Sequence, residues 1–334
     1  MLNNNKLLRI LSSMRLGLIL LGLLGAASAI GSLFSLKYFF ETKAFRLLLL
    51  LLLANMTLCA IGQLQGFLQG FTQKGRQQRE TNGVFLRKAA LLVLHTGIVI
   101  ILIGGLVNSL LGFREQVPLL QGATADLKVE KSAVSCFLKL NDFWIEYNPD
   151  GSAAQFYADI SLAFGSEKAI QETISINHPL KYKGLKIYLM QYIHVINVQG
   201  QADSGWQKTE LLGDGEIFEF LDSAKTIEIV SYLPNYDQEY GNKTKTLRPD
   251  NPRVLYKIHQ EGNPSKLMVA TLGEFFELEP GIYYCFNDVQ PYVGLIVKSD
   301  PGLPLAALGG LMLMLGAILS LYGRSEKKHV PEQG

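Results

Sequence analysis

The sequence predicts a membrane protein with four transmembrane α-helices and one large, mainly-β extracytoplasmic domain. Three observations on the 334 residues support this fold class. Four apolar runs are each long enough to cross a bilayer, which takes about 20 residues of helix. Basic residues gather beside these runs in the pattern that separates cytoplasmic from external loops. The long polar segment before the last run alternates apolar and polar residues as β-strands do.

Each apolar run is nearly free of charge. The first has no charge between Arg15 and Lys37, and the fourth has none at all. The third contains a single ionisable side chain, His95. Buried helices of soluble proteins rarely stay uncharged over such lengths, so we predict membrane spans at residues 16–36, 47–64, 89–113 and 303–322.

The N-terminus also resembles a secretory signal peptide. Basic residues, including Arg15, precede the first run, and Ala27-Ser28-Ala29 fits a small-residue cleavage site. The apolar run nevertheless continues through Phe34, which is long for a signal. We therefore expect this segment to be retained as a span.

The charges beside the spans set the predicted topology, because basic residues stay on the cytoplasmic side. They place the N-terminus 1–15, the loop 65–88 and the tail 323–334 in the cytoplasm. The short connection between the first two spans breaks this pattern, since it is basic yet must lie outside. Lys43 and Arg46 in that connection can snorkel from the start of the second span.

The segment 114–302 is then extracytoplasmic, in a protein of the cell (inner or plasma) membrane. It holds 17 basic and 25 acidic residues, a balance of −8, and the rest of the chain carries +10. An acidic external domain repels phosphate backbones, so this distribution argues against nucleic-acid binding. We interpret the basic loop and tail as topology signals beside membrane lipid.

Strand-like alternation dominates the external segment. The strongest signals are followed or separated by turn residues, such as Asn148-Pro149-Asp150-Gly151. The predicted strands are 137–147, 156–164, 173–176, 186–195, 226–232, 254–259 and 266–270, with two more around Tyr283 and Val293. Short strands with turns between them predict a β-sandwich or layered β domain, and the polar stretch from Pro234 to Pro252 predicts a surface loop.

No recognised catalytic motif is present in the sequence. It contains no nucleophile elbow, phosphate loop, dinucleotide fingerprint or paired-histidine zinc motif. It contains no Cys-x-x-Cys either, which argues against a c-type haem carrier and a thioredoxin-like reductant. We therefore predict no catalytic residue and no metal site, and a role that is not that of a free-standing enzyme.

His95 is the main candidate functional residue. It lies six residues into the third span, which is about 10 Å below the cytoplasmic surface at 1.5 Å per residue. A polar imidazole at that depth needs a partner, and an ionisable group inside a span is a functional site by default. Neutral imidazole is a common axial ligand of haem iron. The alternative is a structural histidine bonded to a neighbouring helix carbonyl.

The remaining candidates lie mostly in the external domain. Cys136 and Cys285 fall in predicted strands, where a disulfide, free thiols and inert packing all remain open. Cys59 in the second span is interpreted as an apolar filler. His178 precedes a proline after a strand and His194 lies within one, positions typical of turn or strand stabilisation.

Small residues recur at helical spacing in the spans. The first span contains the pairs Gly22/Ala26 and Gly25/Ala29, and the third contains Gly104-Gly105. Such residues let helices approach closely, so they favour a packed bundle or a partner helix.

The order of several motifs resembles that of one known family. The motifs are Ser12 to Gly17 before the first span, His95-Thr96-Gly97-Ile98 with Gly104-Gly105, Gly112-Phe113-Arg114, Phe143 to Tyr147 with Asp150-Gly151, Asn177-His178-Pro179-Leu180-Lys181-Tyr182-Lys183-Gly184 through Tyr188 and Gln191, and Asp300 to Pro304 with Gly309. The stretch from Asn177 to Gly184 is the most specific. Together they cover nearly the whole chain, which resembles the ResB (CcsB) family of system II cytochrome c assembly.

This resemblance implies a function in haem delivery. It implies a ResC/CcsA-type polytopic partner, with which the chain would move haem b across the membrane and attach it to the Cys-x-x-Cys-His motif of apocytochrome c. His95 matches the family's transmembrane histidine, which is implicated in holding haem during transit. One histidine fills one axial position, so the second ligand would come from the partner. Haem attachment would then be an activity of the complex, with haem b as a transient, shared cofactor.

Two departures from the family pattern matter. Many relatives have a longer external domain, and the tryptophan-rich haem-handling segment belongs to the partner, since this chain has only Trp144 and Trp206. The main alternative function is a non-catalytic membrane scaffold whose β domain binds an assembly partner without haem. A membrane-bound sensor is disfavoured because the cytoplasmic segments are too short for a signalling domain.

The charge asymmetry makes the topology testable with reporter fusions. A fusion after Gly75 and one at the C-terminus should report the cytoplasm, and a fusion near Gly200 should report the outside. A cytoplasmic signal from the fusion near Gly200 would overturn the predicted topology.

Overall fold

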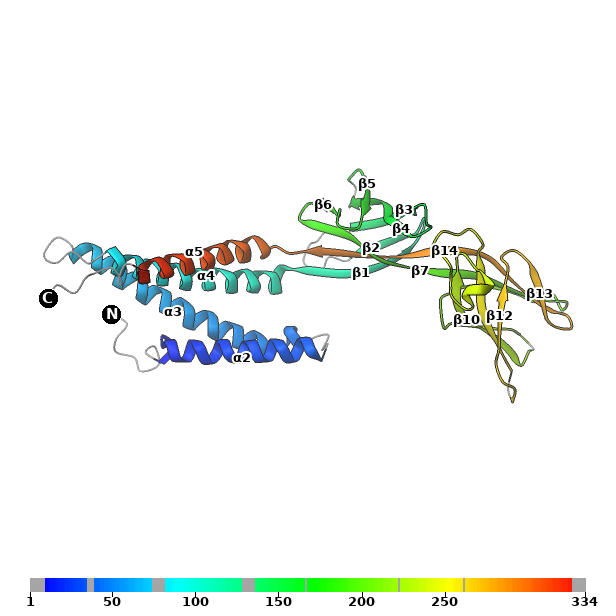
Figure 1. Cartoon of the computed structure of the whole chain (residues 1–334), viewed down its shortest axis with the longest axis horizontal. Coiled ribbons are helices and arrows are strands. Elements are labelled where there is room, and N and C mark those ends of the chain that lie inside the picture. The colour runs from blue at the N-terminus through cyan, green and yellow to red at the C-terminus, as the bar shows by residue number, and fades with distance from the viewer. Residues whose placement is uncertain are drawn as a thin grey trace. The chain divides into compact units, whose positions relative to one another are not determined.

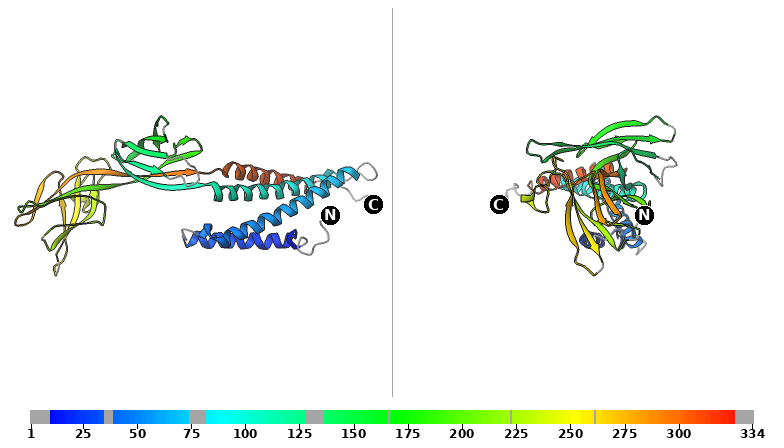
Figure 2. Two further views of the ribbon diagram at one scale, coloured as in Figure 1. Left: turned by 180° about the vertical axis from the view of Figure 1, so that it is seen from behind. Right: turned by 90° about the vertical axis from the view of Figure 1, so that its right-hand side faces the viewer.

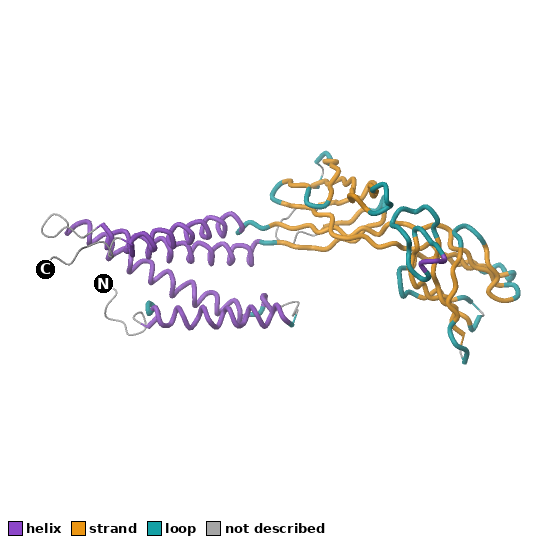
Figure 3. Tube along the Cα trace, in the orientation of Figure 1, coloured by secondary structure: helices purple, strands orange, loops and turns teal. Residues whose placement is uncertain are grey.

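The structure of the protein is a computed structural model that describes residues 10–34, 39–73, 82–127, 136–165, 167–221, 223–260 and 262–325. The chain divides into two compact units. The first is Met1–Gly112 together with Asp300–Gly334, and the second is Phe113–Ser299. The described part of the first unit is helical, and that of the second is built almost wholly from strands (Figure 3).

The helical unit contains four helices that are long and apolar enough to cross a membrane. They are α2 (Met14–Leu33), α3 (Lys43–Gln73), α4 (Asn82–Leu111) and α5 (Leu303–Ser325), with a short 3₁₀ helix η1 (Phe39–Glu41) between the first two. Together with the β unit they confirm the predicted fold class. All four helices begin or end outside the predicted apolar runs, because polar residues at a helix end continue its backbone hydrogen bonding beyond the apolar part.

Glycines bring α4 and α5 into close contact, and the two helices run side by side (Figures 1 and 2). On α4, Gly97 and Gly104 are seven residues apart, and Gly302, Gly309 and Gly316 repeat the same spacing at the start of α5 and along it. A β-carbon at Gly309 would lie 2.6 Å from the Gly97 carbonyl oxygen, and one at Gly104 would lie 2.8 Å from the Gly302 carbonyl oxygen. Seven-residue spacing keeps the glycines on one seam between the helices.

Polar side chains on α3 hold the start of α2. The Asn55 side-chain amide donates to the backbone carbonyls of Leu11 and Ser13, and the Cys59 thiol donates to Ser12. These bonds satisfy carbonyl groups that lie before or at the beginning of α2. The predicted small-residue pairs of α2 make no such approach, because Gly22 and the glycine at position 25 have open space where a β-carbon would lie.

The β unit forms three antiparallel sheets. A six-stranded sheet has the order β1-β14-β7-β6, with β13 added to β14 and β8 added to β7. Two four-stranded sheets have the orders β2-β3-β4-β5 and β12-β11-β10-β9. The strands are β1 (Phe113–Leu120), β2 (Thr124–Leu127), β3 (Cys136–Tyr147), β4 (Ala153–Phe164), β5 (Ile170–Ser175), β6 (Leu180–Tyr182), β7 (Leu185–Ala202), β8 (Gln207–Leu212), β9 (Ile217–Glu219), β10 (Lys225–Leu233), β11 (Arg253–Gln260), β12 (Lys266–Ala270), β13 (Phe275–Glu279) and β14 (Ile282–Ser299).

The six-stranded sheet is shared by two separate hydrophobic cores. One end of it packs on β2 to β5, where residues such as Leu138, Ile160 and Ile187 are fully buried. The other end packs on β9 to β12, where Phe218 and Tyr256 are buried. The predicted layered β domain is therefore a pair of sandwiches that have one sheet in common. Strands β7 and β14, at 18 residues each, run through both cores (Figure 1).

Strand bulges decide which residues of the shared strands face inward. The pairing of β7 with β14 shifts register between Leu189 and Gln191, because Met190 is an extra residue on β7. The inward-facing residues of β7 are therefore odd-numbered before this bulge and even-numbered after it. Tyr192, His194 and Ile196 therefore follow one another on the inward face. Tyr192 packs against the first core and Ile196 belongs to the second. His194 lies at the junction between them.

The strand predictions match the long strands better than the short ones. Strands β1, β2, β6, β8, β9 and β13 have no counterpart among the predicted strands. Apart from β1 these are runs of three to six residues, which carry too little alternation to stand out. The two strands predicted around Tyr283 and Val293 are one strand, β14. The stretch from Pro234 to Pro252 forms the predicted loop, with one 3₁₀ turn, η2 (Gln238–Tyr240).

The contact between α4 and α5 predicts unequal effects for two adjacent glycines. Gly309→Ala places a β-carbon against α4 and should destabilise the helix pair by about 1–3 kcal/mol, the usual cost of overpacking. Gly310→Ala is the matched control, since no atom lies within 4 Å of its β-carbon position. Unfolding of the purified protein in detergent, followed by helical circular dichroism, measures both. Equal stability of the two variants would contradict the glycine seam.

Candidate functional site

His95 lies on α4 and faces α3. Its Nδ1 atom is 2.8 Å from the backbone carbonyl oxygen of Leu91 and 3.2 Å from the side-chain amide of Gln63 on α3. Gly97, two residues further along α4, contacts α5. Because two residues span about 200° around a helix, the imidazole and the glycine seam occupy opposite sides of α4.

The contact with Leu91 indicates which imidazole nitrogen carries the proton. A carbonyl oxygen at 2.8 Å would repel a second lone pair, so Nδ1–H donates to the Leu91 oxygen. The Nε2 atom then carries the free lone pair, and it has no hydrogen-bond partner among the described residues. Histidine ligands of metals are held in this way, with one ring nitrogen bonded to a carbonyl and the other left to coordinate.

Gln63 completes the surroundings of the imidazole. Its Oε1 atom is buried and has no hydrogen-bond partner within the described part of the chain. Turning the amide would point the oxygen at Nδ1–H but leave the amide NH₂ without an acceptor, so one polar atom is orphaned in either orientation. Gln63 therefore faces Nδ1, the nitrogen that donates to Leu91, and Nε2 is the ring atom left for a ligand. The residues present therefore fit one axial position of a haem.

The helices offer one such imidazole within the described residues. Of the five histidines in the chain, His178, His194 and His259 belong to the β unit, and His329 lies outside the described residues. A haem held at His95 would thus need a second axial ligand from elsewhere.

The two cysteines of the β unit are separate, buried thiols. Cys136 belongs to the first core, and Cys285 is buried in β14 beside the second; both are free. Burial and the neighbouring Asp126 carboxylate raise the pKa of Cys136 to about 11, and burial also raises the pKa of Cys285. Neither thiol is ionised at neutral pH, so the structure favours inert packing over a bridge or a reactive thiolate.

His178 is exposed in a tight turn between β5 and β6. Its Nδ1 atom lies 3.4 Å from the Ser175 hydroxyl and 3.3 Å from the Ile176 carbonyl oxygen, and the preceding residue, Asn177, has a φ of 68°. These contacts are those of a turn-stabilising residue. Its hydrogen-bond contacts are with Ser175 and Ile176 and not with Cys136 or Cys285.

A pocket at the junction of the two β cores, here called the waist pocket, was not foreseen from the sequence. Its walls come from the last part of β3 (Phe143, Trp144, Ile145 and Tyr147), from Tyr232 near the end of β10 with Pro234 just after it, and from the loop at Leu247 and Pro249. Its floor is His194 of β7 with Val289 and Pro291 of β14. The cavity volume is about 350 Å³.

His194 has aromatic neighbours in this pocket. The imidazole is edge-on to Tyr192 at 5.2 Å and lies 4.6 Å from the Tyr232 ring, centroid to centroid. Neither of its ring nitrogens has a hydrogen-bond partner among the described residues. Burial lowers the pKa of His194 from 6.5 to about 4, so the ring is neutral at physiological pH. The only sequence signal was its place in an aromatic strand, which says nothing about the elements that close over it.

Comparison with known proteins decides the family. The model of the ResB-like family matches residues 81–277, more than half of the chain. The chain belongs to the ResB-like family. Relatives of this ResB-like chain include the cytochrome c biogenesis protein CcsB of Synechococcus sp. (strain JA-3-3Ab), 27% identical over 296 residues, which are 78% of this chain and 58% of the relative. Another is the cytochrome c biogenesis protein Ccs1 of Rhodomonas salina, 28% identical over 268 residues, 76% of this chain and 58% of the relative.

The ResB-like chain thus spans a little under three-fifths of the length of these two relatives. Among solved structures, the cytochrome c haem lyase CcmF matches 90% of this chain and 34% of its own length, at 11% identity and a TM-score of 0.30. That score is too low to indicate a shared fold.

The lowered pKa of His194 predicts a pH-dependent stability of the β unit. The folded state keeps the ring neutral down to about pH 4, whereas the unfolded chain takes up the proton near pH 6.5. Stability is therefore lost as the pH falls through this window, by up to about 3 kcal/mol. The aromatic rings of Tyr192 and Tyr232 face His194, and the acidic residues Asp214 and Glu216 line a neighbouring cavity that it also borders.

The measurement is denaturant unfolding in detergent between pH 4 and 7, followed by tryptophan fluorescence, because both tryptophans lie in the β unit. His194→Leu should reduce this pH dependence, and His178→Leu, at an exposed turn, should keep it. An unchanged pH dependence in His194→Leu would show that other groups cause it.

Proposed function

We propose that this chain is a haem-handling subunit of a cytochrome c assembly complex, in which His95 supplies one axial ligand to haem. The biogenesis role stated for the CcsB and Ccs1 relatives supports the assembly function. The observation that carries the ligand role is the His95 imidazole itself. Its proton is committed to the Leu91 carbonyl, and its Nε2 lone pair is free.

The chain's own residues would hold and orient the ligand. The Leu91 carbonyl keeps Nδ1 protonated, which makes Nε2 the coordinating atom. Gln63 limits rotation of the ring from the α3 side. The haem is the cargo of the complex, and its iron supplies the coordination bond that replaces the missing partner of the imidazole.

The remaining parts of the assembly would come from other chains. A ResC/CcsA-type membrane partner would provide the second axial ligand and the tryptophan-rich segment, and apocytochrome c would accept the haem. We assign the haem as haem b in transit from the cytoplasm to the outer face of the cell membrane. In this arrangement the termini are cytoplasmic, the β unit is extracytoplasmic, and haem attachment is an activity of the complex.

Replacing His95 tests the ligand role. His95→Ala removes the coordinating nitrogen and leaves a small apolar residue in an apolar helix, so the protein should still fold and bind its partner. The purified complex should hold less haem, measured from its absorption spectrum, and c-type cytochromes should fall. Added imidazole should restore part of the haem by occupying the vacated position.

Two further variants separate coordination from packing. Gln63→Leu leaves the ligand but removes its neighbour, so it should weaken haem binding by about 10–100-fold without abolishing it. His178→Ala, which alters an exposed turn, is the control and should keep full haem. If His95→Ala retains full haem and normal cytochrome c levels, the histidine is a packing residue, and the scaffold alternative gains support.

A further inference from the structure

The waist pocket of the β unit contains a second imidazole suited to coordination. We propose that it is an additional haem-binding site, in which His194 is the axial ligand and the surrounding aromatic rings contact the porphyrin. The choice of haem as ligand rests on the proposed function, and the site itself rests on the geometry of the pocket.

The position of His194 follows from the two shared strands. On β7 it stands between a residue of each core, and on β14 it pairs with Pro291. Each four-stranded sheet covers one end of the shared sheet, so the face at the junction is left for side chains from strand ends and loops. The strand pairing uses only main-chain groups, so it leaves both ring nitrogens of His194 without a backbone partner.

The walls of the pocket are those of a site for a flat apolar ligand. Phe143, His194 and Tyr232 line the pocket and, with Tyr192, form a row of rings that passes from the first core to the second. In the order Phe143, Tyr192, His194 and Tyr232, successive centroids are 5.2, 5.2 and 4.6 Å apart. The volume of about 350 Å³ lies within the usual range of ligand sites but near its lower end. It accommodates part of a porphyrin, and the polar edge of the ligand would remain in water.

The imidazole is in the correct protonation state for coordination. It is neutral at physiological pH, as iron coordination requires, and the pocket wall places no carboxylate beside it. The ring is half-buried and has no hydrogen-bond partner among the described residues, so one of its nitrogens is available to coordinate iron.

A clasp between the two sandwiches closes one side of the pocket. It consists of the β3–β4 turn (residues 148–152) and the loop from Pro234 to Pro252. The amides of Leu247 and Arg248 both donate to the Gly151 carbonyl, at 3.2 and 3.3 Å. Since Leu247 and Pro249 are pocket residues, this contact positions one wall.

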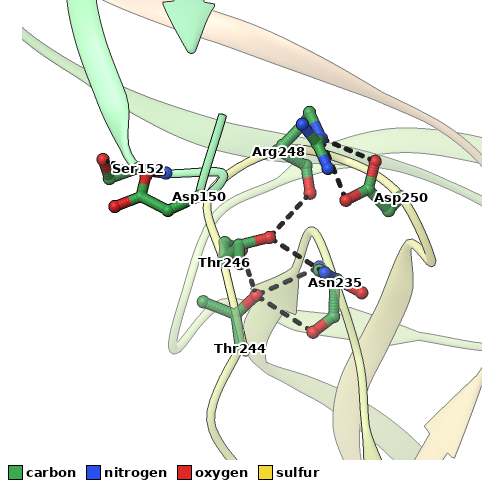
Figure 4. A network of polar contacts seen from close by, with 7 residues as sticks. All are labelled: Asp150, Ser152, Asn235, Thr244, Thr246, Arg248 and Asp250. Carbon is green, nitrogen blue, oxygen red and sulfur yellow. Dashed lines mark hydrogen bonds and ion pairs between the residues drawn. The ribbon is translucent and has the colours of Figure 1, made fainter. Parts of the chain in front are cut away.

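Side-chain hydrogen bonds stiffen both halves of the clasp (Figure 4). In the loop, the Asn235 amide donates to the Thr246 hydroxyl at 2.9 Å, and the Thr244 hydroxyl donates to the Thr246 carbonyl at 2.6 Å. In the turn, the Ser152 hydroxyl and amide both donate to Asp150. A loop held by these hydrogen bonds keeps the pocket wall in a fixed position, as a preformed ligand site requires.

Gly151 is the tightest point of the clasp. Its φ is +81°, and a β-carbon there would lie 2.8 Å from Cβ of Thr246. Gly122 has a φ of +82° and open space where a β-carbon would lie. The two glycines therefore share the same backbone strain on substitution, but only Gly151→Ala displaces the loop.

The test uses haemin and the full-length chain in detergent. His95→Ala is the background, so that a helix-bound haem does not contribute, and Trp206→Phe leaves Trp144 at the pocket rim as the single fluorophore. Haemin titration should quench Trp144 and give the Soret band of a histidine-ligated haem. His194→Ala should remove the histidine-ligated spectrum and weaken binding by about tenfold or more, whereas His178→Ala should change neither.

Variants of the clasp test the same proposal independently of His194. Gly151→Ala should weaken haemin binding by about tenfold relative to Gly122→Ala, because the pocket wall moves while His194 stays in place. A haemin spectrum and affinity that do not change in His194→Ala would overturn the proposal, as would equal affinities of the two glycine variants. Loss of haem from the complex in the His95→Ala variant tests only the proposed site at His95 on α4. A failure of that proposal can therefore be distinguished from a failure of the proposal for the waist pocket.

Discussion

The antiparallel pairing of β7 with β14 is the interaction on which the β unit depends. Both strands take part in two cores, so one register has to bury two sets of side chains at once. A one-residue slip would turn every side chain to the opposite face. The bulges in this pairing, at Met190 and after Phe286, adjust the register between the cores. The junction that results contains His194, which lies beside strands of both covering sheets, β3 and β10.

The helical unit obeys a different constraint. In an apolar surrounding each backbone polar group must be satisfied within the helix, and a polar side chain must find a partner on a neighbouring helix. Asn55 does so through its amide nitrogen, which donates to the carbonyls before α2. The Oδ1 atom of Asn55 and the Oε1 atom of Gln63 have no hydrogen-bond partner among the described residues, and Gln63 meets His95 at its Nδ1 atom. Glycine spacing on α4 and α5 leaves the opposite side of α4 for this polar pair.

His95 and His194 each keep a ring nitrogen without a hydrogen-bond partner among the described residues, but the cause differs between the two. At His95 a carbonyl one helical turn away commits one nitrogen. At His194 the aromatic walls exclude hydrogen bonds and disfavour the charged form. Local helix geometry produces the first arrangement, and long-range strand pairing produces the second.

The sequence by itself determined what depends on local period and composition. Apolar length predicted the four helices, alternation predicted the long strands, and the depth of His95 in an apolar run marked it as a candidate. Tertiary structure alone decided that Cys136 and Cys285 lie apart, that Gly151 carries the clasp, and that His194 faces an aromatic pocket. The contacts at Gly151 and His194 join residues from about 40 to 100 positions apart, and no local pattern specifies such pairings because they depend on register and loop closure.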